Sequence, residues 1–216
     1  MAQQASGVQR IVRWTAIGMI AALLLTVLLA RPSQIIGVLA EEGVAVEEAL
    51  GRPALDKVDR MASSAYYRSL IRTGIYASAY HLLIPTKAQQ ANDPLNLGKT
   101  RGLLVWARDR VNVLFILLFL LYERFSLLLL WLPSTAFIAG AAAVTGWYMR
   151  KVKQGNFAFA SPTLHRYGIG ILTVAAMLAP LMMMLPWPVP PLAFPVALLV
   201  AAFMIMLIIA NVAKRI

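Results

Sequence analysis

The sequence predicts an all-α integral membrane protein with four transmembrane helices and a helical domain between the first and the second. Of its 216 residues, 60% are hydrophobic and only 13% are charged, which is far more apolar than one soluble domain of this length. All nine acidic residues lie between Glu41 and Glu123, whereas residues 1–14, 150–167 and 213–216 carry eight Lys and Arg and no carboxylate. Because short cytoplasmic loops accumulate Lys and Arg, this segregation predicts that the acidic domain and the basic segments occupy opposite sides of a membrane.

The first apolar run, from Thr15 to Ala30, predicts a transmembrane helix over about residues 11–30. Its eight Leu, Ile and Val residues favour insertion into lipid. A cleavable signal peptide is the alternative, but Leu28 stands where the cleavage pattern requires a small residue. We therefore expect an uncleaved signal anchor over residues 1–30, with the N-terminus in the cytoplasm.

Residues 31–124 are expected to form a helical domain in the periplasm. Apolar and aromatic residues recur at helical spacing from Leu55 to Ile84, and Pro85 ends that helix. The polar stretch 85–98 is expected to be a loop, because it contains an Asn-Asp-Pro sequence. A further helix is expected to begin near Lys99.

The segment Val111 to Tyr122 is apolar on every face, yet as a helix it spans only about 18 Å and cannot cross a bilayer alone. Glu123 and Arg124 follow it, and each would cost about 2.5–3.5 kcal/mol at mid-membrane before any pairing. We therefore expect this pair at or outside the outer headgroups, with the second span over about residues 125–149. The apolar segment then needs cover from the soluble helices, from lipid headgroups or from another protein.

Residues 125–216 are expected to form a membrane domain of three spans, over about 125–149, 168–187 and 192–212. A basic cytoplasmic loop, residues 150–167, joins the first two, and a proline-rich turn that cannot continue a helix joins the last two. Four crossings in total place every basic flank inside and the acidic domain outside, whereas five crossings would not.

The residues offer little for catalysis or for a metal site. There is no cysteine, and His81 and His165 are assigned to opposite sides of the membrane, so we expect no cofactor and no metal. Four glutamates between Glu41 and Glu48 are interpreted as a solvated helix face, since no loop of alternating oxygen ligands accompanies them. Nucleotide-binding, serine-hydrolase and zinc-protease motifs are absent from the sequence. Basic residues beside apolar segments explain the net charge of +11, so direct nucleic-acid binding is not expected.

Two groups of residues are the candidates for contacts. Small residues at four-residue spacing are expected to allow close helix packing, with a partner helix in this chain or in another copy of it: Ala136, Ala139, Gly140 and Ala143. Polar and charged residues near the membrane surfaces are the candidates for contact with a partner protein or with lipid: Glu123, Arg124, Arg150, Lys151, Lys153, Ser161, His165 and Arg166. In the second group, Ser161 followed by Pro162 suits a helix start, and His165 with Arg166 is expected to cap the third span. A plain topology signal is the alternative for this loop.

Motifs at residues 147–151, 157–166 and 214–215 read WYMRK, FAFASPTLHR and KR. With the overall layout of the chain, they resemble a family of conjugative-element and conjugative-plasmid inner-membrane proteins designated DUF4400. Family members tend to have Arg-Glu-Ser where this chain has Phe159-Ala160-Ser161, and Tyr where this chain has Leu164. The resemblance implies an accessory protein of conjugative DNA transfer, associated with a type IV secretion system and its coupling ATPase.

We therefore expect a non-enzymatic scaffold, multi-pass in a bacterial inner membrane with both termini cytoplasmic. Its expected partners are membrane lipids and other transfer proteins, with self-association left open. The alternative is a membrane enzyme or transporter acting on lipid or cell-envelope precursors, which would need converging polar residues near the bilayer. Glu123, Arg124, His165 and Arg166 are the residues that could serve it.

Overall fold

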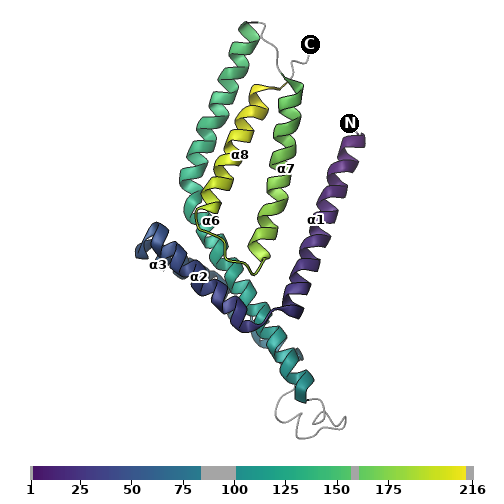
Figure 1. Cartoon of the computed structure of the whole chain (residues 1–216), viewed down its shortest axis with the longest axis vertical. Helices are drawn as coiled ribbons and strands as arrows, with labels where there is room; N and C mark the ends of the chain where they lie inside the picture. Colours follow the sequence, from purple (N-terminus) through teal and green to yellow (C-terminus); the bar gives the residue numbers. More distant parts are fainter. Residues whose placement is uncertain (1, 84–100, 157–160, 213–216) are drawn as a thin grey trace. The chain divides into compact units, whose positions relative to one another are not determined.

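In a computed structural model that describes residues 2–83, 101–156 and 161–212, the regular elements are all helices (Figure 1). Their bounds are α1 (Ala2–Leu29), α2 (Pro32–Leu50), α3 (Arg52–Tyr66), the π-helical turn η1 (Tyr67–Ile71), α4 (Ile75–Leu83), α6 (Arg101–Gly155), α7 (Pro162–Met184) and α8 (Ala193–Ala210). The expected loop at 85–98, the Phe157–Ala160 part of the family motif and the terminal Lys214-Arg215 lie outside the described residues.

The chain divides into two compact units. Unit 1 contains Met1–Thr15, Leu127–Met182 and Pro191–Ile216, and unit 2 contains Ala16–Ser126 and Met183–Pro190. The α7–α8 loop therefore belongs to a different unit from the two helices that it joins.

In unit 2 the chain turns sharply twice. Between Leu29 and Pro32 the helix axis bends by 113°, where Pro32 lacks the N–H that would continue α1. Gly51, with φ +84°, then joins α2 to α3, a backbone conformation that favours glycine. The two helices pack against each other as a helical hairpin.

The region predicted as one helix over 55–84 is interrupted, so that prediction is wrong in its interior. After Tyr66 the backbone widens into the π-helical turn, and Gly74 adopts φ +77° before α4 begins. Apolar periodicity continues on both sides of this break, which is why the periodicity alone did not reveal it.

The apolar segment 111–122 is the central helix of unit 2, and other helices of the same unit cover it. Val113, Leu117 and Leu120 pack with Ile35 of α2 in a core whose members are at most 5% exposed. Aromatic contacts from α3 and α4 reach further side chains of the segment, with Tyr66–Phe119 and Tyr76–Phe115 ring centroids 5.4 and 4.4 Å apart. Five of the twelve side chains of the segment are buried and the other seven are partly buried, which accounts for its apolar composition. Of the three covers expected from the sequence, the structure supplies the neighbouring helices of unit 2.

Segment 111–122 and the expected second span are parts of one 55-residue helix, α6. The charged pair at 123–124 therefore lies within one continuous helix, and Pro133 is also accommodated inside it. By length and composition, α6, α7 and α8 could each cross a membrane, and a fourth crossing is counted if the bent pair α1–α2 is taken as one span. The structure is thus consistent with an all-α membrane protein.

In unit 1, α8 packs between α6 and α7 (Figure 1). Gly146 of α6 lies so close to α8 that a Cβ atom would meet the Met206 carbonyl oxygen at 2.6 Å. Gly168 of α7 lies against Ile208, whose Cγ1 would be 2.9 Å from such an atom. These contacts provide the close packing that small residues permit between membrane helices. The expected packing residue Gly140 instead has nothing within 4 Å of a Cβ position.

Candidate functional site

A buried ion pair between Glu42 and Arg124 lies in unit 2. Arg124 is 1% exposed and Glu42 is 7% exposed. The Arg124 Nη2 atom lies 2.5 Å from Glu42 Oε1, and Nε lies 3.1 and 3.2 Å from the two carboxylate oxygens. This side-on contact uses the Nε–Nη2 edge of the guanidinium and is a strong, charge-assisted arrangement.

The same guanidinium holds the α7–α8 loop. Its Nη1 atom donates to the carbonyl oxygens of Met183 and Leu185 at 3.0 and 2.8 Å, and Nη2 donates to that of Trp187 at 2.6 Å. The Val189 N–H in turn donates to Glu42 Oε1 at 2.8 Å. We refer to Glu42, Arg124 and residues 183–190 as the clasp.

The composition of the loop explains why an arginine suits it. Four of the six residues from Pro186 to Pro191 are prolines, which keep a carbonyl acceptor but have no N–H donor. Arginine offers five N–H donors and no acceptor, and the clasp engages all five. The arrangement therefore satisfies loop carbonyls that have few backbone donors of their own.

The burial of Glu42 and Arg124 departs from two predictions. Arg124 was expected to contact lipid or a partner, and Glu42 was expected on a solvated helix face. The other three glutamates of α2 are exposed, as predicted. A signal was present in the sequence, because Glu42 follows Ile35 by seven residues and precedes Val46 by four, which places all three on one helix face.

A second arginine closes the end of α1. Arg110 Nη1 lies 2.9, 2.7 and 2.8 Å from the carbonyl oxygens of Val27, Leu28 and Ala30. The last carbonyls of a helix lack intrahelical partners and carry partial negative charge, so a guanidinium there is favourable. The sequence reasoning did not identify Arg110, whose acceptors lie about 80 residues away along the chain.

Three of the predicted contact residues gather at the end of α8 in unit 1. Asn211 is 2% exposed, and its Oδ1 atom accepts from Lys153 Nζ at 2.8 Å and from the Ser161 N–H at 3.3 Å. His165 Nδ1 lies 3.0 Å from the carbonyl oxygen of Ile208. The cationic Lys153 is well placed at a helix C-terminus. The three loop residues thus bind the adjacent end of α8, and Asn211 is the common partner of Lys153 and Ser161.

The helix start predicted in this loop is confirmed. Pro162 is the first residue of α7, and the Leu164 N–H donates to Ser161 Oγ at 3.4 Å, as an N-cap requires.

The remaining predicted contact residues are not brought together. Lys151 and Arg166 are exposed, and Lys151 Nζ lies 5.4 Å from the Trp147 ring centroid. Arg150 is partly buried, and its Nε atom has no hydrogen-bond partner. Glu123 is partly buried in unit 2.

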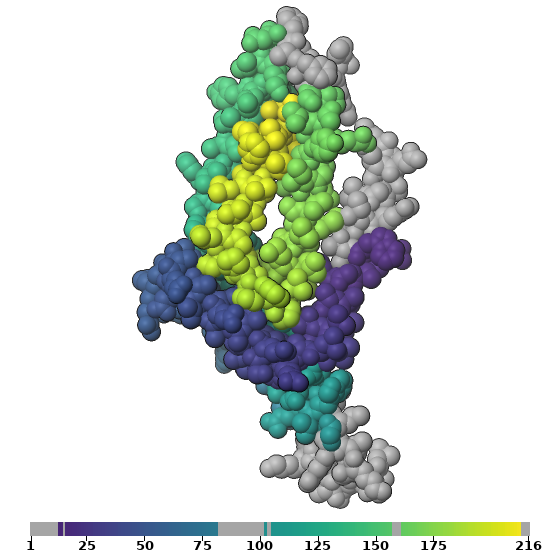
Figure 2. All heavy atoms as spheres, viewed as in Figure 1, coloured from purple at the N-terminus to yellow at the C-terminus, as the bar shows by residue number. Residues whose placement is uncertain are grey.

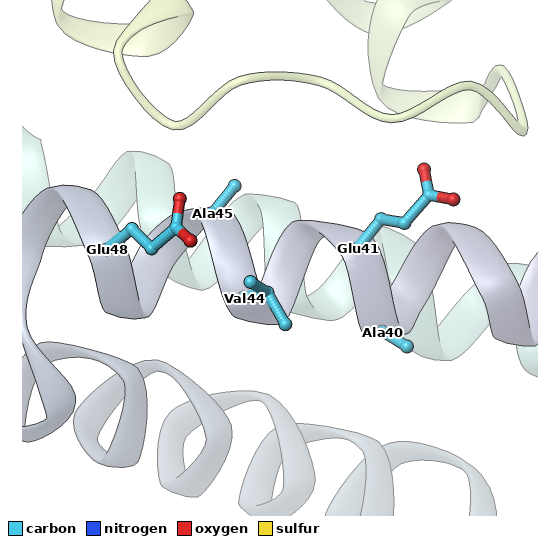
Figure 3. A pocket seen from close by; sticks show the side chains of 5 residues that line it. All are labelled: Ala40, Glu41, Val44, Ala45 and Glu48. Atoms are coloured by element: carbon cyan, nitrogen blue, oxygen red, sulfur yellow. The ribbon is translucent and has the colours of Figure 1, made fainter.

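Among the described residues, no three His, Cys, Asp or Glu side chains are grouped so as to hold a metal ion. A shallow hollow lies on α2, and Figure 3 shows its five lining side chains, with Glu41 and Glu48 two helical turns apart: Ala40, Glu41, Val44, Ala45 and Glu48. It is an open surface feature and not an enclosed pocket.

Residues 36–216 match a family model described as "IncC plasmid conjugative DNA transfer protein DtrJ-like". The comparisons with curated proteins and with solved structures found no match. The match supports the conjugative-transfer class that the resemblance implied, but under the DtrJ-like name and not the expected DUF4400 designation.

Proposed function

This chain belongs to the DtrJ-like family of conjugative DNA transfer proteins, and from that membership we propose that it is a non-enzymatic scaffold of the transfer apparatus in the inner membrane. The observation that carries the proposal is the family match over residues 36–216, which includes α6, α7, α8 and the clasp.

The apolar helices and the charge pattern support a placement in the membrane. We propose that α1, the part of α6 after residue 127, α7 and α8 are the four crossings, with both termini in the cytoplasm. The rest of unit 2 then lies in the periplasm as a packed helical domain. Its partners are proposed to be other transfer proteins of a type IV secretion system, including the coupling ATPase through the cytoplasmic loop.

The use of the buried polar groups favours a scaffold over an enzyme. Arg124 donates to a carboxylate and to three backbone carbonyls, so its donors hold the fold together and leave none for a substrate. His165 and Lys153 likewise have partners at the end of α8. Because segment 111–122 is covered within the chain, we propose that a periplasmic partner binds the exposed faces of α2, α3 and α4.

Conjugation from donor cells provides the direct test. Deleting the gene is expected to lower plasmid transfer, and supplying the wild-type chain from a second plasmid is expected to restore it. Unchanged transfer after deletion would contradict any role in conjugation.

Single alanine variants then separate the scaffold from an enzyme. We expect plasmid transfer to remain proportional to the amount of protein in the membrane in three variants: Glu123→Ala, His165→Ala and Arg166→Ala. Loss of transfer at a normal protein level in Glu123→Ala would favour the enzyme or transporter instead, whereas the same loss in the two loop variants would also fit a lost contact with a partner.

Reporter fusions after Ala91 and Gly155 test the proposed topology. The two reporters are expected in the periplasm and in the cytoplasm, respectively, and a common compartment would overturn the assignment.

A further inference from the structure

We propose that the periplasmic hairpin of α2 and α3 binds a second copy of this chain, the acidic face of α2 on one copy meeting the basic row of α3 and η1 on the next. The acidic face is Glu41, Val44 and Glu48, and the basic row is Arg60, Ser64 and Arg68. The inference concerns self-association and does not depend on the role in DNA transfer.

The acidic face is exposed to solvent, and its two carboxylates form no ion pair with any described residue. Within unit 2, Glu42 forms an ion pair with Arg124, and Glu47 forms one with Arg52 at 3.6 Å. Glu41 and Glu48 are exposed and form no ion pair with any described residue. Val44 lies between them with 57% of its surface exposed. Figure 2 shows α2 at the surface of the molecule, and Figure 3 shows both carboxylates flanking the shallow hollow.

The basic row is produced by the π-helical turn. In an uninterrupted α-helix, Arg68 and Arg72 would be rotated about 80° and 120° away from Arg60. The wider π-helical turn from Tyr67 to Ile71 rotates the chain about the helix axis by a smaller angle per residue than an α-helix does. Arg68 and Arg72 are therefore turned back toward the side of Arg60. Arg60 and Arg68 of the row, and Arg72 beyond it, are exposed and have no hydrogen-bond or ion-pair partner among the described residues.

The two surfaces match in spacing, charge and shape. Glu41 and Glu48 are seven residues apart, about 10.5 Å along a helix, and Arg60 and Arg68 are eight apart, about 12 Å. The exposed Val44 lies midway between the carboxylates, and the small Ser64 lies midway between the arginines. The Ser64 hydroxyl donates to the Met61 carbonyl oxygen at 3.0 Å, so covering it with an apolar side chain leaves its donor satisfied.

Because the two faces differ, each contact leaves a free acidic face on one copy and a free basic row on the other. Copies anchored in one membrane share one orientation, so repetition of this contact extends in the membrane plane, as a ring if its rotation closes and as an open row if it does not. An anionic membrane surface is the other surface that a basic row suits, but it gives no role to the matching acidic face.

Cysteine crosslinking tests the contact in full-length protein, which has no cysteine of its own. Two differently tagged copies are expressed together, one with Val44→Cys and the other with Ser64→Cys, and are oxidised in the membrane. A disulfide between the two tags is expected, since the contact brings these positions within disulfide reach. The matched control replaces Ser64→Cys with Ser78→Cys, which is exposed on α4. Equal crosslinking in the control, or no crosslinking at all, would overturn the proposal.

Charge exchange identifies the partner. We expect the disulfide yield to fall about tenfold when the charges of either surface are reversed. The acidic face is reversed by Glu41→Lys with Glu48→Lys on the Val44→Cys copy, and the basic row by Arg60→Glu with Arg68→Glu on the Ser64→Cys copy. Both changes together restore opposite charges across the contact and should return the yield to within about threefold of the starting pair. Failure of this rescue overturns the proposal. If the arginine variant then also loses binding to vesicles of anionic phospholipid, the basic row contacts the membrane instead.

Discussion

Replacing Arg124 by alanine tests whether the clasp stabilises the fold. The change removes a guanidinium that is 1% exposed and takes away every donor that it gives to Glu42 and to the loop carbonyls. Glu42 would remain buried beside α6 with the Val189 N–H as its one remaining partner in the clasp.

The expected loss follows from the burial of the pair. Breaking a buried ion pair by removing one partner costs about 3–5 kcal/mol, because the other charge stays desolvated. For a chain of this length, each kcal/mol corresponds to roughly 2–4 °C in Tm. Arg124→Ala is therefore expected to lower Tm by about 6–20 °C.

Thermal unfolding of the purified full chain in mild detergent, followed by tryptophan fluorescence, measures this loss. Hydrogen exchange adds a local readout, since the Val189 amide donates to Glu42 and should exchange faster once the carboxylate is released.

Arg52→Ala is the matched control, because it breaks a solvent-exposed ion pair with Glu47, another glutamate of α2. The Arg52 and Glu47 side chains are 79% and 44% exposed, so the change should cost less than about 1 kcal/mol. If both arginine variants melt within about 4 °C of the wild-type chain, the reasoning about buried charge is refuted.

Three further predictions concern other contacts. Gly146→Ala is expected to destabilise the fold by about 1–3 kcal/mol, because the new methyl group meets a carbonyl oxygen of α8. Gly140→Ala has open space around the new methyl group and should be neutral or slightly stabilising. Thermal unfolding in detergent compares the two variants. Asn211→Leu removes the acceptor of the Lys153 ammonium and should cost about 1–3 kcal/mol in the same assay, and equal melting would show that water replaces the amide. Burial, and then a neighbouring aspartate, raise the pKa of Asp59 in α3, so its ionised form disfavours the folded state. Asp59→Asn should therefore stabilise the chain at neutral pH, with the advantage disappearing as pH falls below the ordinary aspartate pKa, and a constant advantage at every pH would refute this cause.

The sequence predicted those parts of the fold that depend on local signals. Apolar runs bounded by proline and basic residues placed the last helix at about 192–212, and α8 spans Ala193–Ala210. Ser161 and Pro162 marked a helix start for the same reason, since an N-cap and its proline are adjacent in the chain. The apolar segment 111–122 was also identified as needing cover, because a helix without a polar face cannot remain exposed.

The remaining features depend on contacts between distant residues. Glu123 and Arg124 were predicted at the end of a span because charges are costly in lipid, but the sequence could not show that Arg124 pairs with Glu42, which lies 82 residues away. Spacing could have placed Glu42 on the apolar face of α2, but it could not have shown what balances the buried carboxylate. The small residues around Gly140 had the correct spacing for packing, whereas the close approach occurs at Gly146, which a spacing rule cannot distinguish.

The clasp has a consequence for genetics. Its acceptors at Met183, Leu185 and Trp187 are encoded well downstream of their donor and its carboxylate partner. A nonsense codon before Met183 would therefore leave the Arg124 guanidinium buried in the preceding helices without these acceptors. Such a truncation should then behave as a null allele through degradation of the whole product, and its phenotype would not show what the missing residues contact.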